Sequence, residues 1–223
     1  MAHEGLSFGR AALASAIALG VVACGPAAPA VQTANVDRGA SEPSAPFPES
    51  SADWSGVHSG RFAMTIPLPH ASGWAVDDRS RAELVAIDHA TKSSLVVLRE
   101  LEPDLVNHTM CEGRARALGL VPTGATRTIE DVVTTGPEAF DTRVRVAIEA
   151  RGGASGPLVG HVMAFGAYVR KCLFVHLTTS VASEADEATL SQRMAMARVK
   201  MVAGITIDEL DTVPRASPVV SRP

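Results

Sequence analysis

Aromatic side chains are scarce in this sequence, at 4% of 223 residues. Proteins that bind nucleic-acid bases or sugars often present aromatic rings as stacking platforms, so this scarcity counts against both ligands. Positive charge is also short, because 20 Lys and Arg residues face 24 Asp and Glu residues and leave a formal net charge of -4. Without a basic field to attract phosphates, we expect no binding to nucleic acid. The core must be built from many small aliphatic contacts.

The N-terminal apolar run is too short to cross a bilayer. It covers residues 11–22, about a dozen residues, whereas a membrane-spanning helix needs roughly 20. This length is typical of the apolar region of a signal peptide. The run ends in Val21-Val22-Ala23-Cys24, which Gly25 follows directly.

This ending resembles the lipobox of bacterial lipoproteins, in which small or branched apolar residues precede one cysteine. Val21, Ala23 and Cys24 fit that pattern. The resemblance implies a diacylglyceryl thioether on Cys24, cleavage of the Ala23–Cys24 bond and a further acyl chain on the new amino terminus, and two or more chains anchor a protein stably. The residue after Cys24 is Gly25 rather than Asp. This resembles the pattern of lipoproteins that are sorted to the outer membrane in many proteobacteria. The alternatives are an ordinary signal peptide with an accidental cysteine and a short core helix.

Composition divides the chain into four segments. Residues 1–23 are the expected lipoprotein signal peptide. Residues 24–58 are rich in Ala, Pro, Ser and Gly without periodicity, which predicts a lipidated flexible tether. Residues 59–210 are the expected globular domain, and about 150 residues are enough to bury a sizeable core. Residues 211–223 are expected to form a disordered tail.

The sequence has three cysteines. With Cys24 committed to lipid, Cys111 and Cys172 form an even pair in an exported chain, where disulfides persist. We therefore predict a bond between Cys111 and Cys172, and two buried free thiols are the alternative. Neither cysteine has a Cys or His neighbour at ligand spacing, so we expect no metal site and no cofactor.

Alternating apolar residues predict strands on both sides of one helix. Before the helix, strands are expected at 60–66, 82–88 and 95–100, with Pro67 and Pro69 ending the first. After it, strands are expected at 127–134, 140–150, 158–168 and 172–179. The last two are apolar on both sides, which indicates that both faces of the sheet are covered.

Spacings of three and four residues predict two helices. The first begins at Pro103, with Cys111 on the buried face and Glu112 toward water. The second begins at a capping box formed by Ser183 and Asp186. Its buried stripe is expected to consist of Leu190, Met194, Ala197, Met201 and Ile205.

Several polar residues suggest a site, but none is assigned a catalytic role. Arg143 and Arg145 are expected to face water, as a solvated sheet face or as a basic docking stripe. His161 and His176 suggest a metal site, yet hairpin geometry predicts that they lie on opposite faces of the sheet. The glycine-rich segment 151–157 lacks the Lys-Ser/Thr ending of a phosphate loop and the serine-centred spacing of a nucleophile elbow.

The expected fold class is α+β, with one antiparallel sheet of about six or seven strands and helices on both faces. The order of elements resembles the PsbP-like family, as does an opening strand that runs from Phe62 to Pro67 and is followed by Gly73 and Trp74. That family includes an extrinsic photosystem II subunit, a Ran-binding nuclear import factor and many bacterial envelope proteins. The resemblance implies a non-catalytic module that docks on a larger assembly, and it assigns no functional residue.

The sequence leaves three functions open. The first is a lipid-anchored protein of the cell envelope, at the outer membrane, that binds or scaffolds a protein partner. The second is a binder of a small apolar ligand or lipid beneath the methionine-bearing final helix, which an apolar cavity of a few hundred Å³ would favour. The third is a periplasmic hydrolase, which a pocket holding a polarised histidine would favour.

Overall fold

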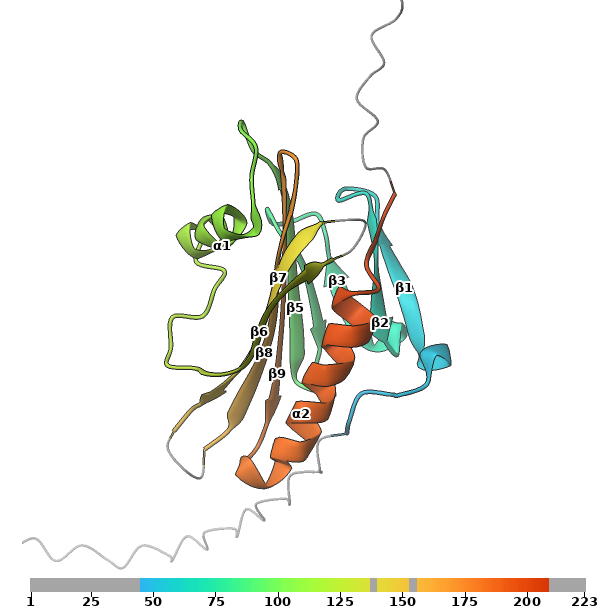
Figure 1. The fold of residues 1–223 in the computed structure, drawn as a ribbon. Coiled ribbons are helices and arrows are strands. Elements are labelled where there is room, and N and C mark those ends of the chain that lie inside the picture. Colours follow the sequence, from blue (N-terminus) through green and yellow to red (C-terminus); the bar gives the residue numbers. More distant parts are fainter. Residues whose placement is uncertain (1–44, 137–139, 153–155, 209–223) are drawn as a thin grey trace, which may run out of the picture. The chain divides into compact units, whose positions relative to one another are not determined.

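Figure 1 shows a computed structural model of the chain, which describes residues 45–136, 140–152 and 156–208. All of these belong to one unit, residues 40–223. The lipobox, Cys24 and the tail 211–223 lie outside the described residues. The structure therefore concerns the globular part of the chain.

Seven antiparallel strands form the main sheet, in the order β3-β4-β5-β9-β8-β7-β6. Their bounds are β3 Trp74–Asp77, β4 Leu84–Asp88, β5 Ser93–Leu101, β6 Arg127–Thr135, β7 Asp141–Ala150, β8 Leu158–Tyr168 and β9 Lys171–Val181. β8 and β9 are central, and nearly all their residues are buried. Their apolar sequences suit this place, because a strand covered on both faces needs no polar side.

One helix lies on each face of this sheet (Figure 1). α1 (His108–Ala117) is bonded to Cys172 of β9, while the next residue, Leu173, belongs to the core shared with Leu190 of α2 (Glu187–Met196). Because successive residues of a strand point to opposite faces, α1 and α2 cover different sides. The predicted α+β class, with helices on both faces of an antiparallel sheet, is confirmed. No helix in the described ranges is long and apolar enough to cross a membrane.

A second sheet, in the order β1-β2-β10, packs on the α2 side and includes residues interpreted as tether. Its strands are β1 Trp54–Ser59, β2 Met64–Pro69 and β10 Thr206–Ile207. Phe47 is buried, and the Gln192 side chain holds its backbone with hydrogen bonds of 2.9 Å and 2.7 Å. The tether predicted for 24–58 was thus wrong for residues 45–58. β1 is a half-exposed edge strand of Ser, Gly and His, so it lacks the apolar alternation that identifies a strand.

β2 begins later than predicted and contains Pro67 and Pro69, which were expected to end it. The N–H of His70 donates to the Asp53 carbonyl at 2.8 Å, on the β1 side. The nitrogens of Pro67 and Pro69, at odd positions, therefore face the other side, where β10 pairs only with the first two residues of β2. Neither proline removes a hydrogen bond from the ladder, so both are tolerated.

Both helices begin later than predicted. α1 begins at His108 rather than near Pro103, because the Asn107 side chain accepts from the Met110 N–H at 2.9 Å and caps the helix. The Ser183 hydroxyl donates to the Asp186 carboxylate at 3.4 Å and caps no backbone N–H, so the predicted capping box was wrong. A 3₁₀ turn precedes α2, and a π-helical segment, Ala197–Val202, continues it. The predicted stripe is buried throughout: Leu190, Met194, Ala197, Met201 and Ile205.

Candidate functional site

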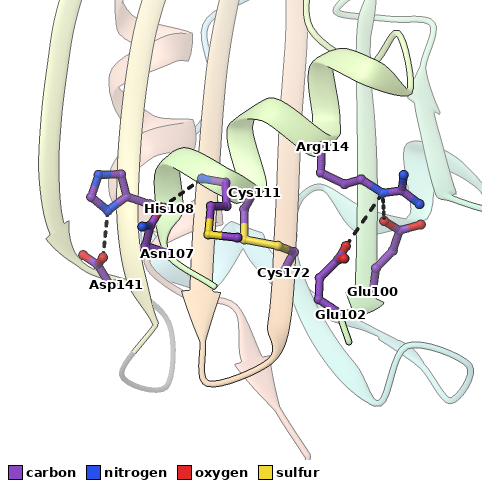
Figure 2. The surroundings of a disulfide bond; sticks show 9 residues. Glu100, Glu102, Asn107, His108, Cys111, Arg114, Asp141 and Cys172 are labelled. Atoms are coloured by element: carbon purple, nitrogen blue, oxygen red, sulfur yellow. Dashed lines mark hydrogen bonds and ion pairs between the residues drawn. A yellow bond between two sulfur atoms is a disulfide. The ribbon is translucent and has the colours of Figure 1, made fainter. Parts of the chain in front are cut away.

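The predicted disulfide bond between Cys111 and Cys172 is present in the structure (Figure 2). The two Cα atoms are 5.4 Å apart, and both side chains are buried together with Ala167. The bond joins the first turn of α1 to the start of β9. It therefore fixes α1 against a central strand of the main sheet.

Ion pairs hold α1 on both sides of the disulfide (Figure 2). His108 Nδ1 lies 2.7 Å from the Asp141 carboxylate, which comes from β7. Arg114 Nε lies 3.1 Å from Glu100 and 3.7 Å from Glu102, at the end of β5. Such surface pairs contribute at most about 1 kcal/mol each. Their role is to orient the helix that the disulfide attaches.

Glu112, Arg143 and Arg145 were predicted to face water, but Glu112 is buried and the two arginines lie against it, so these predictions are corrected. Glu112 is buried and accepts from Arg143 and Arg145, each at 3.0 Å. Asp131 of β6 accepts from Arg143 at 2.7 Å. Burial alone would raise the pKa of Glu112, but the hydrogen bond from Arg116 and the charges of the sheet arginines outweigh it and lower that pKa. The arginines thus serve to seat α1 on the sheet.

Three exposed apolar residues belong to the end of β5, the segment before α1 and the β8–β9 turn, which backbone hydrogen bonds join. Leu101 and Leu105 are each 71% exposed, and Val169, in the β8–β9 turn, is 56% exposed. The N–H of Val106 donates to the Val169 carbonyl at 2.9 Å, which ties the segment before α1 to that turn. Val169 has a φ of 55°, a strained conformation for a β-branched residue. We call Leu101, Leu105 and Val169 the apolar tip.

The apolar tip lies at the opposite end of β5 from the place where the chain enters the domain (Figure 1). The fully buried guanidinium of Arg193 binds the carbonyls of Ala45 and Thr91, each at 2.8 Å. Thr91 precedes β5 and Leu101 ends it, a separation of roughly 30 Å at the rise of a strand. Arg193 was not predicted to be a functional residue, although it lies three residues after Leu190 and so falls on the buried face of α2.

His161 and His176 lie on the same face of the sheet, which overturns the prediction that they face opposite sides. The structure pairs Tyr168 with Lys171, so Val169 and Arg170 form the turn. This differs by one residue from the expected register, and such a shift reverses the face of every side chain. His161 Nδ1 lies 3.1 Å from His176 Nε2, and the side chains are 2% and 8% exposed.

The partners of the histidine pair determine where its protons lie. His176 Nδ1 is 3.1 Å from the Leu120 carbonyl, which accepts only, so this nitrogen carries a proton. His176 Nε2 is then the acceptor for the Nδ1–H of a neutral His161. That leaves His161 Nε2 without a hydrogen-bond donor, 3.4 Å from the Glu149 carboxylate. The pair joins the segment after α1 to the sheet and lies in the core, away from solvent.

Acid is expected to destabilise the protein through His176. Burial, and next the adjacent His161, lowers the pKa of His176 from 6.5 to about 4. The unfolded chain binds this proton below pH 6.5 and the folded chain only near pH 4, so stability falls between these values, by about 3 kcal/mol at most. Burial also lowers the pKa of His161, against the opposing effect of Glu149, and this acts in the same direction.

Urea unfolding of wild type and His176→Gln at pH 7.5, 5.5 and 4.5 measures this effect. The variant should lose much less stability than wild type over this range. His89→Gln, at an exposed hairpin tip, is the matched control. Its free energy of unfolding should depend on pH as that of wild type does. If the free energy of unfolding depends on pH equally in wild type and His176→Gln, the buried pair does not titrate as described.

The hollow beside Met194 of α2 is small rather than a cavity of a few hundred Å³. The space has a volume of about 180 Å³ between α2 and β6, and an ion pair of 2.6 Å between Arg198 and Glu130 lies beside it. Pockets for small molecules usually measure about 300–1,000 Å³. Met194 and Met201 are buried, as expected of residues that fill a core. In the described part of the chain, no three His, Cys, Asp or Glu side chains are grouped to hold a metal ion.

No family model matches this chain, and no curated protein matches it either. Among solved structures it is similar to the Ran-binding protein Mog1p of Saccharomyces cerevisiae, at 12% identity and a TM-score of 0.49 over 70% of this chain and 96% of that one. It is also similar to cyanobacterial PsbP from Synechocystis, at 12% identity and a TM-score of 0.42 over 67% and 92% of the two chains.

A third similar structure is LpqN of Mycobacterium tuberculosis, which is described as involved in cell envelope biogenesis. It shares 12% identity, with a TM-score of 0.38 over 69% of this chain and 89% of that one. At this level of identity, no residue role passes from these proteins to this chain. Its function has to be inferred from the arrangement of its own residues.

Proposed function

We propose that this protein is a lipid-anchored component of the bacterial cell envelope whose α+β domain binds a protein partner and catalyses no reaction. The observation that carries the proposal is the apolar tip, three exposed apolar residues on segments that backbone hydrogen bonds join and that lie next to a helix fixed by a disulfide. Exposed apolar residues on a rigid support are typical of protein-binding surfaces.

The proposed anchor is attached to the end of the domain that lies far from the apolar tip. The proposed lipid is on Cys24, and the described domain begins at Ala45. About 20 residues separate these points, which span at most roughly 70 Å when extended. Because the chain enters at the far end of β5, the apolar tip is free to face away from the membrane. Gly25 after the anchor supports the outer membrane as the location.

Charged groups and histidines in the domain have structural partners. His161 and His176 bond to each other and to the segment after α1, and both are shut off from solvent. Glu112 neutralises the arginines of the sheet. These contacts support binding over hydrolysis. The hollow of about 180 Å³ beside Met194 gives the proposed ligand site beneath this helix less support than the tip gives to protein binding.

Photo-crosslinking in intact cells tests the proposal. A photoreactive residue at Leu105, which is 71% exposed, should give discrete adducts with a partner, whereas one at Val199, which is 56% exposed on the α2 side, should give none. Cys24→Ser should abolish the Leu105 adducts, because the domain leaves the membrane surface. The absence of adducts at Leu105, or the same pattern at both positions, would contradict the proposal.

A further inference from the structure

The end of β5 has a free edge. The pairing of β4 with β5 stops at Leu84 opposite Val97, while β5 continues to Leu101 and stays paired with β9 on its other side. Within the described ranges, no strand pairs with residues 98–101 on the β4 side. A strand edge of this kind can accept another extended segment.

The backbone direction shows which groups this edge offers. Glu102 donates its N–H to the Arg170 carbonyl at 2.7 Å and continues the ladder between β5 and β9. In an antiparallel ladder, residues at even positions of this strand therefore point their backbone groups toward β9. Those at odd positions, Arg99 and Leu101, point their N–H and C=O groups to the opposite side. These four backbone groups face the side of β5 where β4 has ended and no longer pairs with it.

An open groove of about 660 Å³ lies along this edge, and specific contacts keep it open. Arg61 donates to the carbonyls of Asp78 at 3.0 Å and Ala82 at 2.9 Å, and this holds the loop before β4 away from β5. Arg99 donates to the Phe62 carbonyl at 2.8 Å and fixes the opposite wall. The groove is thus built by hydrogen bonds between segments that are distant in sequence.

The charges around the groove favour a negatively charged occupant. Arg61, Arg99 and Lys171 line it, together with Glu100 and Asp208. The charge of Glu100 is already paired with Arg114 at 3.1 Å. Arg61 and Arg99 donate to backbone carbonyls, which leaves their positive charges in the lining. Electrostatic complementarity of this kind selects partners and steers their approach.

We propose that this groove binds an extended acidic segment of the protein partner, which adds as a strand beside residues 98–101 of β5. The backbone groups of Arg99 and Leu101 supply the hydrogen bonds, and the cations of the groove attract the carboxylates of the segment. Leu101 belongs to both the groove and the apolar tip, so the two surfaces are continuous. This assignment rests on the proposed protein-binding function and names the chemistry of its partner.

Two substitutions of Leu101 separate the backbone from the side chain. Leu101→Pro removes the N–H that faces the groove and blocks strand addition, but it removes no bond to β9, because that N–H points the other way. Leu101→Ala keeps the N–H and removes only the side chain. The probe is a synthetic peptide, acetyl-Thr-Val-Asp-Val-Glu-Val-Thr-amide, and its control has Lys in place of Asp and Glu. Unfolding midpoints establish that both variants fold.

The peptide should slow amide exchange at Arg99 and Leu101 in wild type. Leu101→Pro should weaken binding at least about tenfold, and Leu101→Ala only about two- to threefold. The lysine peptide should bind at least about tenfold more weakly than the acidic one. Equal binding to the two variants, or equal binding of the two peptides, would overturn the proposal.

Other occupants of the groove would give a different result. If the two amides exchange slowly without peptide, and removal of residues 209–223 or dilution abolishes this protection, the groove belongs to the chain's own C-terminal segment or to a second copy, and the proposal fails. Adducts at Leu105 are independent of this result. If they form while the acidic peptide does not bind, protein binding stands and only the groove assignment falls.

Discussion

Replacing Arg193 by Met is expected to lower the free energy of unfolding by about 3–5 kcal/mol. The guanidinium is fully buried and donates to the carbonyls of Ala45 and Thr91, each at 2.8 Å, to Thr179 Oγ1 at 3.1 Å and to the Ser180 carbonyl at 3.3 Å. A methionine fills much of the same volume but donates no hydrogen bond, so the half-buried carbonyls of Thr91 and Ser180 lose this donor, while Thr179 Oγ1 keeps its hydrogen bond from Ser93 at 2.9 Å. Each such group costs about 1–3 kcal/mol, and partial relaxation reduces their sum.

Two further variants show whether the network or the charge matters. Burial lowers the pKa of Arg193, while Asp88 and Asp186 oppose this, and the group remains a cation. Arg193→Lys keeps the charge without the planar fork and should lose an intermediate amount of stability. Arg198 lies in the π-helical segment that continues α2. Arg198→Met removes its partly exposed ion pair with Glu130 and should cost less than about 1 kcal/mol. Urea unfolding measures all three, and a loss for Arg193→Met no larger than that for Arg198→Met would contradict the proposed role.

Removing the disulfide by the double substitution Cys111→Ala and Cys172→Ala is expected to cost about 4 kcal/mol of stability, by the loop-entropy relation. The bond closes a loop of 61 residues, so it strongly restricts the unfolded chain. The ion pairs of Arg114 and His108 are too weak to compensate. Denaturant unfolding of the oxidised protein and the double variant gives the difference, and α1 should show faster amide exchange.

Cys24→Ala is the matched control for the disulfide variant. It removes a cysteine without changing the loop, so the domain should unfold at the wild-type denaturant concentration. Reduction of the wild-type protein should reproduce the loss seen in the double variant. Unchanged stability after reduction would show that the bond does not constrain the unfolded chain as expected.

The sequence predicted the parts of the fold that follow from regular apolar spacing. Six strands of the main sheet, the buried stripe of α2 and the pairing of two cysteines all depend on patterns within short segments or on simple counting, whereas the short strand β3 was not predicted. β1 was missed because an edge strand needs no apolar alternation. Pro67 and Pro69 were misjudged because their tolerance depends on how little of β2 the short strand β10 covers.

The histidine pair shows how a local error changes a site. Arg170 and Lys171 are polar and suggested the turn, whereas Val169 is β-branched and an unfavourable residue for a positive φ. The structure nevertheless places Val169 in the turn, and the shift of one residue brings His161 and His176 together. Only the tertiary structure identifies this register, because the packing of the flanking strands determines it.

Arg193 and Glu112 are charged residues at buried helical positions. Glu112 was predicted to face water and Arg193 was not singled out, since charged residues are seldom buried without partners. Those partners come from β7 in one case and from the segment around Ala45 in the other. The sequence does not show that such distant segments meet, so neither cluster was predictable from it.

The intact mass of the native protein, purified from membranes of a producing bacterium, tests the anchored and oxidised state most directly. The expected chain begins at Cys24, carries a diacylglyceryl group with a further acyl chain, and is two protons lighter than the form with free thiols on Cys111 and Cys172. A chain that retains residues 1–23 and carries no acyl group would contradict the proposed location and function.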